Sequence, residues 1–88
     1  MPKFWPMTLL ESLARQLSSH LRGSQVFNKD KLVEVIREHN IVFANDVKID
    51  EDEQGEHLVL TFDDTLVCFE LVWNQVGPRF TLTEIILA

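Results

Sequence analysis

Residues His57–Trp73, HLVLTFDDTLVCFELVW, carry the strongest structural signal in the chain. Two runs of β-branched, aromatic and leucine residues flank Asp63 and Asp64, a pattern that predicts two strands joined by a tight turn. In the second run, apolar residues recur at period two around Phe69, and the positions between them are also nearly all apolar. A strand that is apolar on both faces needs cover on both faces. We therefore expect a central hairpin that fills the core with one face and keeps apolar side chains on the other.

Two amphipathic segments precede this hairpin. Residues 9–22 repeat leucine at helical spacing, and Thr8 with Glu11 has the pattern of a capping box at the start of a helix. Residues 29–40 follow Asn28, a residue that often caps helices, and repeat apolar side chains at the same spacing. The sequence predicts one helix in each segment.

The rest of the chain predicts strands and short turns. We expect a first strand at residues 47–49, a loop from Asp50 to Glu56, the two arms of the hairpin, a turn at 74–79 and a last strand at 80–87. The apolar connector 41–44 should be buried, either as an extension of the helix or as the start of a strand. Short turns give an antiparallel meander, so the predicted fold is α+β, with two N-terminal helices packed on a four-stranded antiparallel sheet. We expect residues 1–88 to form a single domain, with 1–7 as an irregular N-terminal arm.

The last two strands can be aligned by pairing Trp73 with Phe80, which brings Leu71 opposite Leu82. This register leaves an apolar set on the reverse face of the sheet and places Glu84 on the core face beside Phe69. The predicted reverse-face residues are Leu66, Cys68, Val72, Ile85 and Leu87.

Charge is concentrated at one end of the domain. The net charge is −6, and residues 46–64 hold eight acidic residues against one lysine, which gives −7. The remaining six acidic and seven basic residues give +1. Such polarity argues against direct binding to nucleic acid or to a membrane surface and favours a basic protein partner. The candidate acidic surface consists of Asp50, Glu51, Asp52, Glu53 and Glu56.

No catalytic or metal-binding pattern stands out. Residues 50–55 open like a calcium-binding loop, but the twelfth position is Thr61 where a bidentate carboxylate is needed. The three histidines and the single Cys68 have no metal-ligand spacing. A lone cysteine also fits a reducing compartment, so we expect a cytoplasmic location. The sequence predicts no enzyme, no cofactor and no membrane span.

The sequence therefore predicts a small protein-interaction module that binds a protein partner or a second copy of itself. Phe4 and Trp5 are large apolar residues in the arm. They either dock on the protein's own core or join the reverse-face residues as candidates for partner binding. One alternative is an acidic inhibitor or immunity-type protein that caps a basic, nucleic-acid-binding site on a partner. Another is a small-ligand binder or enzyme with a pocket between helix and sheet.

Overall fold

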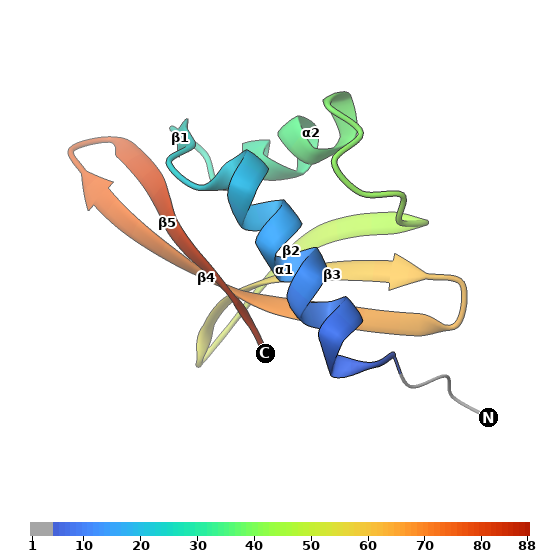
Figure 1. Cartoon of the computed structure of the whole chain (residues 1–88). Coiled ribbons are helices and arrows are strands. Elements are labelled where there is room, and N and C mark those ends of the chain that lie inside the picture. The colour runs from blue at the N-terminus through green and yellow to red at the C-terminus, as the bar shows by residue number, and fades with distance from the viewer. Residues whose placement is uncertain (1–4) are drawn as a thin grey trace.

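The computed structural model describes residues 5–88, which form two helices and one five-stranded antiparallel sheet (Figure 1). The strands lie in the order β1-β5-β4-β3-β2. The predicted α+β class, with helices ahead of an antiparallel meander, is confirmed, although the sheet has five strands where we expected four. The elements are α1 (Met7–Leu21), β1 (Gln25–Val26), α2 (Lys31–Glu38), β2 (Asp46–Asp52), β3 (Gly55–Phe62), β4 (Thr65–Val76) and β5 (Arg79–Leu87).

The additional strand, β1, lies in a segment that the sequence presents only as a linker. Gly23 has a φ of 89°, which turns the chain after α1. The Gly23 N–H then donates to the Leu82 carbonyl at 2.8 Å, and the Leu82 N–H donates to the Ser24 carbonyl at 2.9 Å. Val26 lies opposite Phe80. Two residues are too short for an alternating pattern, so only their pairing with β5 identifies them as a strand.

Both helices begin differently from the prediction. Pro6 is the N-cap of α1, and its carbonyl accepts the Leu9 and Leu10 N–H groups. The capping box is therefore wrong, because Thr8 lies inside the first turn and makes no capping hydrogen bond. Before α2, the Asn28 side chain accepts the Asp30 N–H at 3.0 Å. This bond stabilises the turn that leads into the helix.

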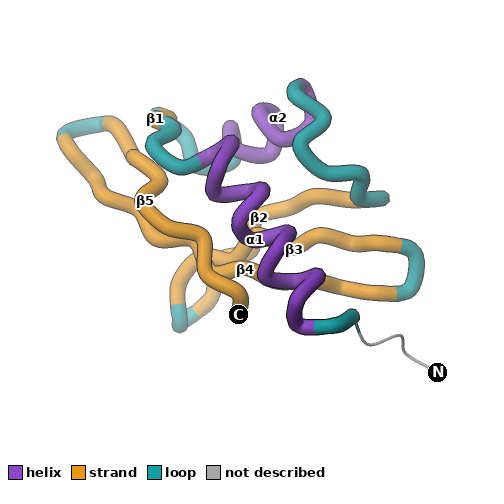
Figure 2. Tube along the Cα trace, in the orientation of Figure 1, coloured by secondary structure: helices purple, strands orange, loops and turns teal. Residues whose placement is uncertain are grey.

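The two helices pack on the same face of the sheet. Figure 2 shows α1 crossing in front of the strands, with α2 at one end of the same layer. Phe69 at the centre of β4 is fully buried, and its neighbours on this face are buried with it. The core lies between helices and sheet and includes Leu17, Leu21, Leu32, Ile36, Val47, Leu58, Leu60, Val67, Leu71, Leu82 and Ile85.

A β-bulge in the last strand pair corrects the predicted register. Phe80 lies opposite Gln75 and not Trp73, so the predicted register is wrong by two residues next to the turn. The pairing then shifts by one residue between Val72 and Trp73, so that Trp73 lies opposite Leu82 while Leu71 lies opposite Ile85. The one-residue insertion turns every later side chain of β5 to the other face. Glu84 therefore faces solvent, and the predicted placement of this carboxylate in the core is wrong.

The connector between α2 and β2 is only partly buried. Ile41 is 5% exposed and packs into the core, as expected, but Phe43 is 88% exposed. The expectation that the whole connector is buried is therefore wrong. In the described part of the chain, neither helix is long and apolar enough to cross a membrane.

Candidate functional site

The face of the sheet opposite the helices, which we call the outer face, carries much of the predicted apolar set. Leu66, Cys68 and Val72 all belong to it, because they alternate along β4 with buried core residues. Leu66 is 67% exposed. Cys68 and Val72 are partly buried, so Cys68 is not the enclosed core residue that its apolar neighbours would indicate.

The bulge changes which β5 residues complete this face. Ile85 is only 8% exposed and Leu87 packs against the core, so the prediction that both lie on the outer face is wrong. Ile86 takes their place. It lies opposite Glu70 and is 43% exposed. The outer face thus keeps an apolar residue from β5, but not either of the two that we predicted.

A continuous row of side chains crosses the middle of the outer face. In this row Val59 lies opposite Lys48 on one side and Cys68 on the other. Val59 is 7% exposed although both α1 and α2 pack on the opposite face. Its neighbours on the adjacent strands therefore bury it, and the centre of the outer face is well packed before any partner arrives.

A recess at one end of β4 brings together four of the predicted partner-binding residues. Because β5 ends at Leu87, opposite Phe69, the first residues of β4 have no strand neighbour among residues 5–88 on that side. Trp5 lies beside this gap and packs against Phe62 with ring centroids 4.7 Å apart. The recess has a volume of about 230 Å³ and is lined by Trp5, Leu10, Thr65, Leu66, Val67, Cys68, Leu87 and Ala88.

The other predicted partner-binding residues do not reach this recess. Val72 lies further along the outer face, and Ile85 is in the core. Phe4 lies outside the described residues. The candidate site is therefore the recess together with the outer face onto which it opens through Leu66 and Cys68.

The acidic residues lie mostly in the hairpin between β2 and β3. The predicted loop from Asp50 to Glu56 is wrong, because β2 continues to Asp52 and β3 begins at Gly55. Residues Asp50–Glu53 are all exposed. The Asp50 carboxylate lies 3.5 Å from the Lys48 ammonium, and Asp52 lies 3.7 Å from the His57 ring. These are loose surface pairs, so the carboxylates remain accessible to a partner.

Glu56, by contrast, belongs to the helix side of the sheet. Its side chain is 11% exposed and forms an ion pair with Lys29, just ahead of α2. The Lys29 ammonium also lies 4.6 Å from the centroid of the Phe80 ring. The Glu56 carboxylate is thus paired within the protein and is not exposed to a partner. It differs in this respect from Asp50–Glu53, the four exposed acids that the sequence grouped with it.

The sequence did not single out the tip of the β4–β5 hairpin. This hairpin extends past Gly55, the first residue of β3 (Figure 1). Val76 near its tip is 66% exposed. Phe27 is 67% exposed, and the Arg79 guanidinium lies 5.4 Å from its ring centroid. The signal that could have identified this arm is the length of the apolar run, since the second strand continues beyond any partner for it in β3.

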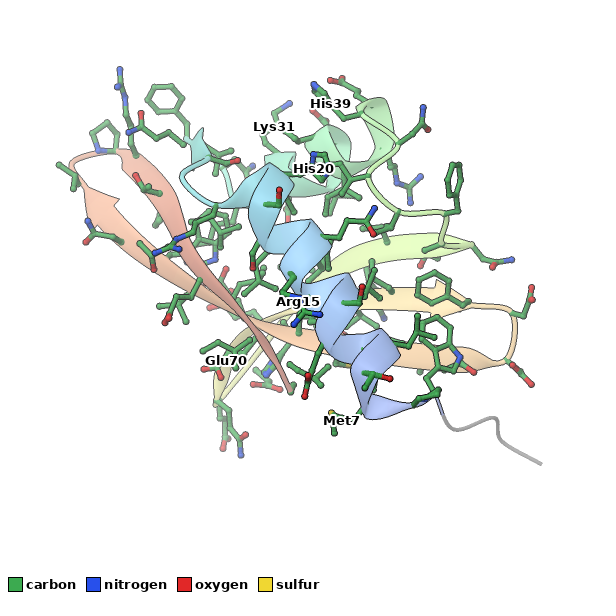
Figure 3. The ribbon with its side chains drawn as sticks, viewed as in Figure 1. Met7, Arg15, His20, Lys31, His39 and Glu70 are labelled. Carbon is green, nitrogen blue, oxygen red and sulfur yellow. The ribbon has the colours of Figure 1, made fainter. Side chains whose placement is uncertain are left out.

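Among residues 5–88, no group of three or more histidine, cysteine, aspartate or glutamate side chains could hold a metal ion. His20 is near the end of α1 and His39 directly follows α2, whereas Glu70 is on β4, so these side chains do not form one cluster (Figure 3). No known protein family, no curated protein and no solved structure matches the chain. Any function assigned to it must therefore come from its own residues.

Proposed function

We propose that this chain is a protein-binding module that docks a partner on the outer face and inserts one of the partner's apolar side chains into the recess beside Trp5. The observation that carries this proposal is that both helices cover one face of the sheet, which leaves Leu66 67% exposed and Ile86 43% exposed on the other. Exposed apolar side chains that adjoin a recess are typical of protein interfaces.

The size of the recess supports a protein partner over a small ligand. Its volume is about 230 Å³. Small-molecule pockets usually measure about 300–1,000 Å³ and enclose most of the ligand. A space of this size suits a single anchoring side chain, and interfaces often concentrate their binding energy in such anchors. The aromatic ring of Trp5 gives the anchor a large apolar wall.

The charges around the outer face indicate a partner with a basic rim. Asp46, Asp50, Glu70 and Glu84 border the apolar residues, against Lys48 and His57. The exposed hairpin acids Asp50–Glu53 continue the same negative surface. Face-to-face packing of two copies would bring these carboxylates toward each other, and like charges oppose association. We therefore favour a different protein with a basic surface, located in the cytoplasm, as the partner of this chain. A second copy of the chain fits this surface less well.

The test compares two substitutions that are matched in exposure. Leu66→Asp alters the recess, and Val76→Asp alters the far tip of the β4–β5 hairpin, where the native side chain is 66% exposed. Proteins captured from host extract with the unmodified chain would be purified and titrated against both variants by calorimetry. We expect Leu66→Asp to weaken binding by about 2 kcal/mol or more, as an interface anchor does, and Val76→Asp to leave the affinity unchanged.

Ionic strength and oligomeric state complete the test. Replacement of Asp50 and Asp52 by asparagine should weaken binding and reduce its dependence on salt, because fewer carboxylates face the basic rim. Equal affinities of the Leu66→Asp and Val76→Asp variants would refute docking at the recess. A concentration-dependent dimer in sedimentation that Leu66→Asp dissociates would show that the face serves self-association instead.

A further inference from the structure

The second half of β5 has an open edge, which is a separate surface from the recess and the outer face. On the edge that faces away from β4, β5 pairs with β1 only at Phe80 and Thr81. Leu82 adds two hydrogen bonds to the turn before β1. No residue among 5–88 pairs with Thr83–Leu87 on that side. Beyond the end of β1, residues Thr83–Leu87 of β5 therefore form an open edge of the sheet.

The backbone groups along this edge can be placed from the hydrogen bonds that the strand does make. The Ala88 N–H donates to the Cys68 carbonyl, toward β4. Backbone groups alternate in direction along an antiparallel strand, so those of Leu87 and Ile85 point the other way, toward the open edge. Their N–H and C=O groups form two pairs of positions to which an added strand can bond.

Helix α1 forms a wall beside this edge. Figure 2 shows the C-terminal half of β5 running alongside α1. A groove of about 410 Å³ lies between them, lined by Ile85 of β5, by Ala14, Arg15, Ser18 and Ser19 of α1, and by Arg22, the residue that caps the C-terminus of α1. The small alanine and serine side chains keep the groove open. A strand edge next to a helix wall is the arrangement in which proteins bind extended peptides by adding them as a further strand.

The wall carries positive charge without ion-pair partners. Arg15, labelled on α1 in Figure 3, and Arg22 are both exposed, and neither forms an ion pair with any residue among 5–88. They are seven residues apart, or about 10 Å along the helix axis. Two guanidinium groups at this spacing can reach carboxylates at different positions of one extended chain. Two acids lie close to these arginines: Glu84 lines an adjoining hollow together with Arg22, and Glu11 lies one helical turn before Arg15 on α1. Neither forms an ion pair with them.

We propose that the groove between α1 and the open edge of β5 binds an extended acidic segment of a partner protein, which adds to the sheet as a sixth strand. The backbone of Ile85 and Leu87 supplies the strand hydrogen bonds, and Arg15 and Arg22 pair with carboxylates of the segment. A second copy of β5 is a poorer occupant, since Thr83–Leu87 carries a single carboxylate to offer the two arginines.

The proposal is tested with a fluorescein-labelled heptapeptide that alternates glutamate with valine, followed by anisotropy with the whole chain. We expect saturable binding that weakens by at least about tenfold when Arg15 and Arg22 are both changed to glutamine, because both charge-assisted contacts are lost. Lys31→Gln removes one positive charge from α2 and serves as the control, with unchanged binding expected. The counterpart peptide with lysine in place of glutamate should not bind.

Backbone pairing is tested separately from charge. Two analogues of the peptide carry N-methyl groups, one on its valines and one on its glutamates. Because alternate amides of an added strand face β5, only one analogue should lose binding. In hydrogen exchange, the Ile85 and Leu87 amides should exchange faster than the Ile86 amide in the free chain and become protected with the peptide.

Any of the following results with the peptides would overturn the proposal: no saturable binding, equal binding of the lysine peptide, equal binding to the arginine variant, or equal binding of both N-methyl analogues. Protection of the Ile85 and Leu87 amides that rises with protein concentration in the absence of peptide would show that a second copy occupies the edge, which also contradicts it.

Discussion

The two faces of the sheet are built from the same strands, yet they are packed very differently. On the helix face, Phe69 of β4 is fully buried beneath α1 and α2. On the outer face, Leu66 of the same strand is 67% exposed. Both faces are rich in apolar residues, so composition alone does not distinguish a core from an interface. The difference comes from the cover that the helices provide, and each of the following substitutions tests it.

The largest effect is expected at the centre of the helix face. Phe69→Ala should lower the free energy of unfolding by about 3–5 kcal/mol, because it removes a fully buried ring and leaves a cavity. Cys68→Ala, one residue away on the outer face, should lower it by less than ~1 kcal/mol. Urea denaturation of both variants measures the difference. Similar losses for the two would mean that the outer face is as enclosed as the helix face.

An intermediate effect is expected at the ion pair on the helix side. Lys29→Met leaves the Glu56 carboxylate, which is 11% exposed, without its partner, and should lower the free energy of unfolding by about 1–3 kcal/mol. Lys31 pairs with Glu34 at 59% exposure for both side chains, so Lys31→Met should change it by less than ~0.5 kcal/mol.

A second substitution identifies the cause of that loss. Adding Glu56→Gln to Lys29→Met removes the unpaired charge, so part of the stability should return. If the double variant is no more stable than Lys29→Met alone, the lost stability comes from the contacts of the Lys29 ammonium with the Phe80 and Trp73 rings, whose centroids lie 4.6 Å and 6.0 Å away, rather than from the carboxylate.

The smallest effect is expected on the outer face. Leu66→Thr should change the free energy of unfolding by less than ~0.5 kcal/mol, since a side chain that is 67% exposed removes little apolar surface from water when the protein folds. Thermal unfolding at several protein concentrations provides the measurement. A loss of more than ~1.5 kcal/mol that grows with concentration would mean that a second copy covers Leu66.

The course of β5 shows where prediction from the sequence failed. An alternating pattern correctly identified a last strand, but it could not locate the bulge between Val72 and Trp73. The signal was the carboxylate of Glu84, which an unbroken register places in the core. A buried, unpaired charge is costly enough that the strand gains by inserting a residue, and the insertion moves Ile85 and Leu87 to the helix side.

Only part of the candidate site could be predicted from the sequence. Alternation within β4 correctly assigned Leu66, Cys68 and Val72 to the face opposite Phe69, because side-chain direction along one strand is a local property. The recess required more. It exists because β5 ends opposite Phe69 while Trp5, far away in the sequence, packs on Phe62. No local pattern contains that meeting of distant segments.

The amino-acid sequence by itself determined the α+β class, the meander and the apolar character of both sides of β4, since these follow from periodicities of two and 3.6 residues and from short turns. Only the tertiary structure decided that both helices lie on one face, that β1 stops short along β5, and that Glu56 is tied to Lys29 while Asp50–Glu53 remain exposed. Each of these depends on contacts between residues far apart in the chain, which form because they bury apolar surface or pair charges once the whole domain has folded.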